Sequence, residues 1–161
     1  MIEIVPYNPN WVELYNQELN KIRLALDNSI LSIHHFGSTS IIGLSAKPKI
    51  DIMIVVESFL TFNASALVAL NYVNRGEVIP SGRYFSKDTP HKYHVHVFEQ
   101  GNPLITKNLT FRNWLRTHDK DREEYEKLKT KLSQIHTDGM KYCSDKTDFI
   151  SKILKKASQS S

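Results

Sequence analysis

Apolar residues in the first third of the chain follow two spacings, one typical of helices and one typical of strands. Over residues 11–26 they recur every three or four positions, which predicts a helix with Asn8 or Asn10 available as its cap. Residues 31–36 indicate a strand. Isoleucine and valine occupy every second position of residues 49–56, a pattern that predicts a second, mostly buried strand.

The rest of the chain combines further strands with a helical end. Residues 60–73 carry apolar positions at helical spacing, and residues 75–80 indicate a strand that ends in the turn Ser81-Gly82. Residues 93–99 indicate another strand, and Asn102-Pro103 has the cap-then-proline order that opens a helix. Three helices are expected in the last third, over residues 102–115, 120–135 and 146–157. This order predicts an α+β fold with a small mixed sheet, flanking helices and a helical C-terminal third.

Length and composition place the chain among ordinary globular proteins. A chain of 161 residues can bury one hydrophobic core, so we expect a single domain over residues 1–158 and a frayed tail, 159–161. The single cysteine, Cys143, excludes an internal disulfide, and no secretory pattern is visible. The longest apolar run, residues 50–56, is far shorter than the roughly 20 residues that span a bilayer. We therefore expect a cytoplasmic protein that is not inserted in a membrane.

The net charge of +4 is compatible with an anionic partner but selects none. Much of the excess lies in two lysine clusters, residues 127–131 and 152–156, which we interpret as solvated helix faces. No stripe of interleaved arginine and aromatic residues is visible, which argues against nucleic acid as the partner. No local motif encodes the oligomeric state.

The sequence Gly37-Ser38-Thr39-Ser40 directly follows a predicted strand. A glycine permits a tight turn, and a turn with exposed N–H groups and hydroxyls has the parts of a phosphate cradle. An ordinary turn at the end of a strand is the alternative.

Asp51 lies in the middle of an otherwise apolar strand, where an ionised carboxylate is costly unless it is paired, hydrogen-bonded or metal-bound. A salt bridge to Lys47 or Lys49, exposure on an uncovered sheet face, and a metal site all satisfy this requirement. The nearby loop favours the functional interpretation.

Two histidines and two arginines are further candidates. His94 and His96 are two positions apart on a predicted strand, so both rings project from one face and could bind a metal together, or simply face solvent. Arg112 and Arg116 are four positions apart on a predicted helix, therefore on one side of it.

The two arginines could converge on a triphosphate or another anion together with Lys47, Arg83 and Lys87, because charge-assisted hydrogen bonds favour such ligands. Ordinary surface charge is the alternative.

Phe36-Gly37-Ser38, followed about a dozen residues later by Asp51, resembles the signature of the nucleotidyltransferase superfamily, whose loop holds nucleotide phosphates and whose strand carboxylates bind divalent metal. Residues 35–52 as a whole are similar to the GrpB family, an offshoot of that superfamily, which implies a nucleotidyltransferase-like fold. The likeness continues at residues 83–85, 94–97 and 111–116, at Tyr125 with Lys129, and at Tyr142 with Lys146.

The resemblance implies a nucleotide-binding, metal-assisted transferase. Ser38 and the loop amides would hold a nucleoside triphosphate or another phosphorylated small molecule. Asp51 and His96 would be catalytic by positioning one divalent ion, magnesium, manganese or zinc, for an undefined acceptor. Catalytic members have a second carboxylate where this chain has Met53, and the family more often has aspartate at Asn113. The missing carboxylate favours the alternative, a non-catalytic module that binds a nucleotide or another anion.

Overall fold

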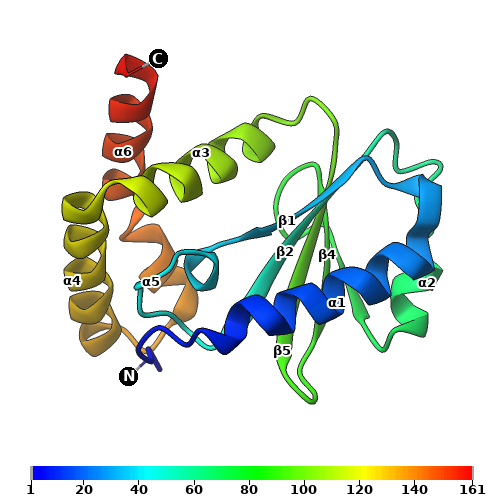
Figure 1. Cartoon of the computed structure of the whole chain (residues 1–161), viewed down its shortest axis with the longest axis horizontal. Coiled ribbons are helices and arrows are strands. Elements are labelled where there is room, and N and C mark those ends of the chain that lie inside the picture. The colour runs from blue at the N-terminus through cyan, green and yellow to red at the C-terminus, as the bar shows by residue number, and fades with distance from the viewer. Residues whose placement is uncertain (1, 161) are drawn as a thin grey trace.

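Five strands form one mixed sheet in the computed structural model, which describes residues 2–160 (Figure 1). The strand order is β1-β2-β5-β4-β3, with β2 parallel to β5 and all other neighbours antiparallel. The strands are β1 (Ser32–Phe36), β2 (Lys49–Val56), β3 (Val73–Gly76), β4 (Gly82–Lys87) and β5 (Lys92–Glu99). The helices are α1 (Asn10–Leu26), α2 (Ala64–Ala69), α3 (Pro103–Thr117), α4 (Asp119–Ile135), α5 (Gly139–Ser144) and α6 (Thr147–Gln159), with short 3-10 helices η1 (Asp27–Ser29) and η2 (Ser38–Ser40) on either side of β1. The α+β class and the small mixed sheet are thereby confirmed.

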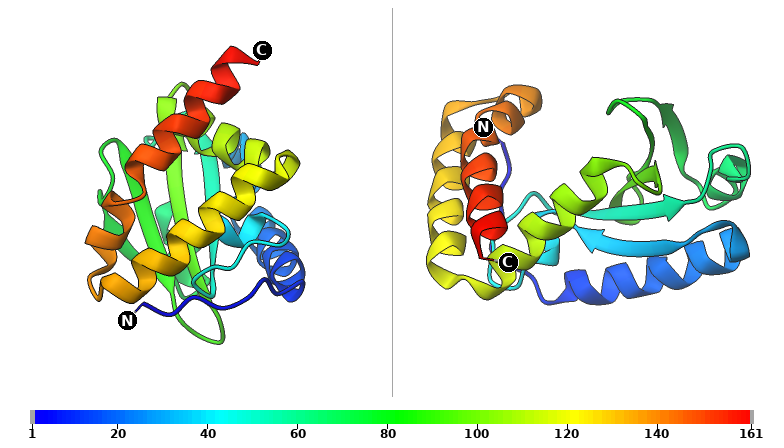
Figure 2. Two further views of the ribbon diagram at one scale, coloured as in Figure 1. Left: turned by 90° about the vertical axis from the view of Figure 1, so that its left-hand side faces the viewer. Right: turned by 90° about the horizontal axis from the view of Figure 1, so that it is seen from above.

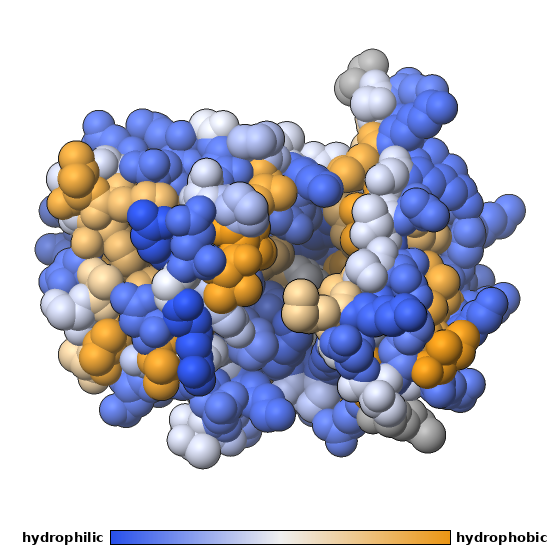
Figure 3. Space-filling model, turned by 180° about the vertical axis from the view of Figure 1, so that it is seen from behind, coloured by the Kyte–Doolittle hydropathy of each residue, from blue (hydrophilic) through white to orange (hydrophobic). Residues whose placement is uncertain are grey.

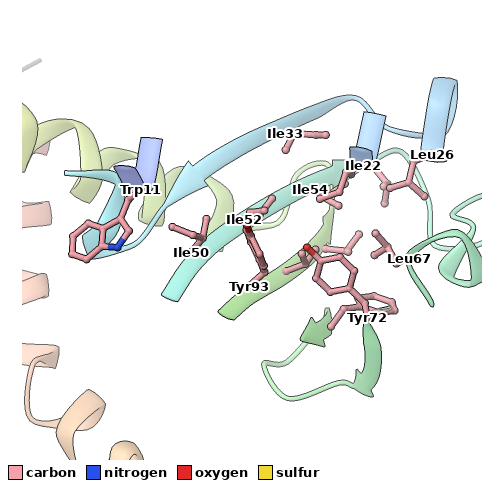
Figure 4. Close-up of a cluster of buried hydrophobic side chains, with 14 of the residues drawn as sticks. Trp11, Ile22, Leu26, Ile33, Ile50, Ile52, Ile54, Leu67, Tyr72 and Tyr93 are labelled. Atoms are coloured by element: carbon pink, nitrogen blue, oxygen red, sulfur yellow. The ribbon is translucent and has the colours of Figure 1, made fainter. Parts of the chain in front are cut away.

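Helices α1 and α2 cover one face of the sheet and build the largest hydrophobic core. Alternate side chains of β2 point to this face because side chains in a strand alternate between its two sides. Ile52 and Ile54 are fully buried there, and Ile22 of α1 and Leu67 of α2 pack against the same cluster (Figure 4). The apolar side chains that recur every three or four residues in α1 thus pack against those that alternate along β2, in one core.

The buried carboxylate of Glu18 connects α1 to strand β4. The carboxylate of Glu18 accepts a hydrogen bond from the Tyr72 hydroxyl at 2.8 Å and pairs with the ammonium of Lys87 on β4 at 2.6 Å. Glu18 is 1% exposed, so it depends on these two partners for the solvation that it has lost.

The opposite face of the sheet is covered only in part. Leu104 and Leu109 of α3 pack there against Met53, Val55 and Phe98. The rest of α3 runs away from the sheet to α4, α5 and α6, which stand together at one end of it (Figure 2).

A second core joins this helical group to the segment after η2. Leu115, Tyr125 and Phe149 form it with Ile41 and Leu44. The segment between β1 and β2 is therefore held between the sheet and the helices.

Most of the predicted elements are confirmed. The helix over 11–26, the strands over 31–36, 49–56 and 93–99, and the three C-terminal helices are all present within two residues of their expected limits. Asn102 caps α3 as expected, since its side chain accepts from the N–H of Leu104 at 2.9 Å. For α1 the side chain of Asn8 instead accepts from the N–H of Asn10, just before the first turn.

Two predictions about the middle of the chain were wrong, and two elements were missed. The helix expected over 60–73 is only the short α2, and the chain leaves it at Asn71 with a positive φ of 73°. The strand expected over 75–80 is β3, which ends at Gly76 beside a bulge. Strand β4 was missed because its alternation is weak, with Tyr84 and Phe85 as neighbouring apolar residues. Helix α5 was also missed.

The predicted tail is partly helical. Helix α6 continues to Gln159, and the N–H of Ser160 donates to the carbonyl of Ala157, whereas Met1 and Ser161 lie outside the described residues. Among residues 2–160, no helix is both long and apolar enough to cross a bilayer.

Candidate functional site

A pocket of about 170 Å³ lies where the beginning of β2, the loop after β1 and the helices meet. Viewed from the side opposite α1, the surface is hollowed between the sheet and the helical group (Figure 3). The glycine and polar side chains that line the pocket are Gly37, Ser38, Thr39, Lys47, Lys49, Asp51, Asn108, Arg112, Tyr125, Lys129, Tyr142, Cys143 and Lys146. The loop predicted to bind phosphate therefore borders this pocket.

Gly37 allows the loop to lie directly against β2. Its φ is +73°, a conformation that L residues rarely adopt, and a Cβ at this position would collide with Oδ2 of Asp51. The next three residues form η2, in which the Ser40 hydroxyl donates to the carbonyl of Gly37 and the Thr39 hydroxyl bonds with the ring of His35. Ser38 and Thr39 line the pocket, whereas the Ser40 side chain serves the turn.

Asp51 is paired with Lys49, one of the two lysines considered from the sequence. The ammonium of Lys49 lies 3.0 Å from Oδ1 and 3.3 Å from Oδ2 of Asp51. Burial raises the pKa of Asp51, but Lys49, His96 and His94 lower it more, so the net pKa is below its ordinary value. Burial lowers the pKa of Lys49, and Asp51 overcomes this effect and raises it. The pair is therefore charged at neutral pH.

Three more lysines surround the remaining space, and two of them enclose an aromatic ring. The ammonium groups of Lys47 and Lys146 lie 4.5 and 4.4 Å from the ring centroid of Tyr142, a distance typical of cation–π contacts. The ammonium of Lys129 donates to the carbonyl of Ser45, and this lysine is only 2% exposed.

Burial and the nearness of other lysines lower the pKa values of these three lysines. Burial, reinforced by Lys146 and other lysines, lowers the pKa of Lys129 to about 7. Burial also lowers the pKa of Lys146 to about 8, with Lys47 and Lys49 adding to the effect. Burial lowers the pKa of Lys47 as well. A nearby anion would favour the ammonium form of all three.

The hydroxyl of Tyr142, whose side chain lines the same pocket, has no partner among the described residues. It is buried, and within residues 2–160 it has no hydrogen-bond partner, an arrangement that is rare in folded proteins. Such a hydroxyl remains free to donate one hydrogen bond.

His94 and His96 lie on the same side of the sheet as Asp51. Asp51 is opposite His94 in the parallel pairing of β2 and β5, and both imidazoles act on its pKa. Their rings, however, belong to an aromatic cluster: His96 stacks on Tyr84 at 4.9 Å, and His94 meets the same ring edge-on at 5.5 Å. In residues 2–160, no three histidine, cysteine, aspartate or glutamate side chains are grouped closely enough to hold a metal ion.

The arginines occupy different places. Arg112 lines the pocket and donates to the carbonyl of His35 at 2.8 Å, while Arg116 donates to the carbonyl of Ser40 at 2.9 Å. Both therefore fix the backbone around the loop. Arg83 is not brought to the pocket, since its guanidinium lies over Phe59, on the face of the sheet that α1 covers.

Lys87 is also absent from the pocket lining. Its ammonium pairs with the buried Glu18 beneath α1, on the opposite face of the sheet. The structure therefore brings Lys47 and Arg112 together at the pocket, and places Arg83 and Lys87 elsewhere.

Sequence reasoning missed the contribution of the C-terminal helices. Lys129 was assigned to a solvated helix face and is buried, and Tyr125 and Tyr142 were given no role and line the pocket. Lys129 lies four positions after Tyr125, on the same side of α4, and Lys146 lies four positions after Tyr142, in the turn between α5 and α6. This repeated tyrosine-lysine spacing was the signal that could have found them.

Comparison with known proteins gives a consistent answer. The family model described as GrpB protein matches residues 1–156. The UPF0157 protein YqkA of Bacillus subtilis is 38% identical over 92% of this chain, although the chain spans only 45% of YqkA. The UPF0157 protein BH1888 of Halalkalibacterium halodurans is 34% identical over 97% of this chain and 82% of BH1888.

The crystal structure of the conserved protein GrpB from Enterococcus faecalis superimposes with a TM-score of 0.82. The two chains are 34% identical, and the match covers 96% of each. The family resemblance seen in residues 35–52 thus extends over the whole fold, and the chain belongs to the GrpB family.

Proposed function

We propose that the pocket binds the phosphate groups of a nucleotide or of another phosphorylated small molecule. The observation that carries this proposal is the charge of the pocket. Among the described residues that line it, five are basic and one is a carboxylate, and that carboxylate is already paired with Lys49. An excess of buried cations is costly without an anion, so the site favours an anionic ligand.

Several neutral donors would complement the cations. The Ser38 hydroxyl and the loop beginning at Gly37 face the pocket, and the Tyr142 hydroxyl lacks a partner. Phosphate oxygens accept several hydrogen bonds, and those from charged donors are the strongest. Lys146, Lys47 and Arg112 would supply the positive charge, while hydrogen bonds from the hydroxyls of Ser38 and Tyr142 would orient the phosphate.

Two features favour the non-catalytic alternative over a metal-dependent transferase. Lys49 occupies both oxygens of Asp51, where a metal would bind. Met53, at the position where catalytic nucleotidyltransferases have a second carboxylate, is fully buried beneath α3. The sequence around Gly37-Ser38 and Asp51 supports kinship with the nucleotidyltransferase-like superfamily, and we propose that this chain has kept the anion cradle of that fold.

The test compares ATP binding by calorimetry in the wild type and two variants. Lys146→Gln should lower the affinity about tenfold, because it removes one charge-assisted hydrogen bond. Lys141→Gln, on the exposed side of α5, should change the affinity less than about twofold. Equal losses in both variants would point to general surface charge, and no loss with Lys146→Gln would refute the proposal.

The second candidate is metal-assisted nucleotidyl transfer, and one observation favours it. Asp51, His94 and His96 share one side of the sheet, so a divalent ion bound with a nucleotide could displace Lys49 and use these side chains. Asp51→Asn should then abolish the increase in ATP affinity that Mg²⁺ or Mn²⁺ causes. If the ions change ATP affinity equally in the wild type and Asp51→Asn, Asp51 is only an ion-pair partner.

A further inference from the structure

We infer that the ligand of this pocket carries a planar aromatic ring, and that the ring stacks on a sheet surface formed by Phe36, Tyr84 and His94. This inference rests on the proposed phosphate site and adds the chemical class of the group attached to the phosphate. It makes the ligand a nucleotide, as opposed to a sugar phosphate or a polyphosphate.

The surface is a set of rings in mutual contact. Tyr84 and His96 are stacked with centroids 4.9 Å apart and planes 14° apart, and Tyr84 meets His94 edge-on at 5.5 Å. Phe36 of β1 meets His96 edge-on at 5.6 Å. Rings fixed by one another keep their orientation, so a further ring can stack on them with little loss of side-chain entropy.

These rings keep part of their surface exposed. Helix α3 covers the part of this sheet face that holds Met53, Val55 and Phe98, and Phe36 packs at the edge of the same cluster, whereas Tyr84 and His94 lie outside it. Phe36, Tyr84, His94 and His96 are each only partly buried. A group of contacting rings that stays partly exposed beside a pocket commonly marks a binding site.

The ring surface is continuous with the phosphate pocket. Phe36 and Asp51 line the pocket, and Asp51 is opposite His94 in the pairing of β2 and β5. The Lys49 ammonium lies 3.0 Å from Asp51, and after the larger effect of burial its charge acts to lower the pKa values of His94 on β5 and Tyr84 on β4. A ligand with its phosphate at Lys146 and its ring over β5 would extend from the pocket along this face of the sheet.

The two parts of the site differ in chemistry. The pocket offers ammonium groups and the guanidinium of Arg112, whereas the adjoining surface consists of aromatic rings. A ligand that complements both has an anionic end and a flat, apolar end. Because every nucleobase has such a face, the surface predicts a preference for nucleotides over bare phosphates and does not predict which base.

The experiment measures the affinities of ATP and of inorganic triphosphate by calorimetry, with a chelator present so that metal coordination by His94 plays no part. The wild type should bind ATP about tenfold more tightly, since stacking of one base contributes about that much. Tyr84→Leu and His94→Leu should each remove most of this preference and leave triphosphate affinity within about twofold. Tyr84→Phe and His94→Phe should retain it, because they retain the ring.

His91→Leu is the matched control, since His91 is exposed in the turn before β5 and is not among the contacting rings. Equal affinity of the wild type for ATP and triphosphate would overturn the ring surface and leave the phosphate site intact. A preference that persists in Tyr84→Leu and His94→Leu would overturn it as well. If neither compound binds, the proposed function fails and this inference with it.

Discussion

Gly37 shows how one residue sets the distance between the loop and the strand carboxylate. Replacement by alanine would require the positive φ to be kept and would place a methyl group against Asp51. We expect Gly37→Ala to lower the free energy of unfolding by about 2–4 kcal/mol, from backbone strain and from the displaced ion pair.

Gly76→Ala provides the comparison, because Gly76 has a φ of +74° with no atom within 4 Å of the added methyl group. Only the strain of about 1 kcal/mol should remain there. Urea unfolding of both variants therefore separates the contact with Asp51 from the backbone effect. Equal destabilisation would mean that Asp51 moves away at no cost.

The side chains around the pocket show what the sequence could predict at this scale. Gly37, Ser38 and Asp51 were found because a glycine-serine turn beside a strand carboxylate is a local pattern. The environment of Lys129 was not, because Ser45 and the lysines that lower its pKa, Lys146, Lys47 and Lys49, lie in other segments of the chain.

At the scale of elements, prediction succeeded where a periodic apolar pattern was long. Helix α1 buries one regular side, and strand β2 is a long apolar run that is buried on both faces. Strand β4 carries Arg83, Ser86 and Lys87 among its six residues, so its polar content conceals it, and tertiary contacts such as Lys87 with Glu18 stabilise it. Short helices such as α5 have too few turns to show a period.

The link between α1 and β4 gives an element-scale prediction. Glu18→Ala would leave the ammonium of Lys87 buried without its counter-charge, which should lower the free energy of unfolding by about 3–5 kcal/mol. Glu13→Ala, on the exposed side of the same helix, should cost less than about 0.5 kcal/mol. Thermal unfolding followed by circular dichroism measures both. Similar small shifts would show that the buried pair adds nothing to the docking of α1.

At the scale of the whole molecule, the pocket belongs to neither half alone. The sheet supplies the loop, Lys49 and Asp51, whereas α3 to α6 supply Arg112, Lys129 and Lys146. Arg112 and Arg116 join the halves through backbone carbonyls of the β1 end and the loop. A bound anion would contact both groups of elements, so binding should stabilise their packing against one another.

The lowered pKa values of the pocket lysines also link ligand binding to the uptake of protons. With a pKa of about 7, Lys129 is mostly neutral at pH 8, and Lys146, with a pKa of about 8, is half protonated. An anion binds the ammonium forms better, so at pH 8 each binding event should draw protons from the buffer. The calorimetric enthalpy should then change with the ionisation enthalpy of the buffer, and Lys129→Met should reduce that change. Since the ammonium forms are lost as pH rises from about 7 to 9, affinity should fall over the same interval. Identical enthalpies in all buffers would show that the protons stay where they are. If the enthalpy does vary with the buffer, the protein takes up protons when a ligand binds and returns them to the solution when the ligand leaves.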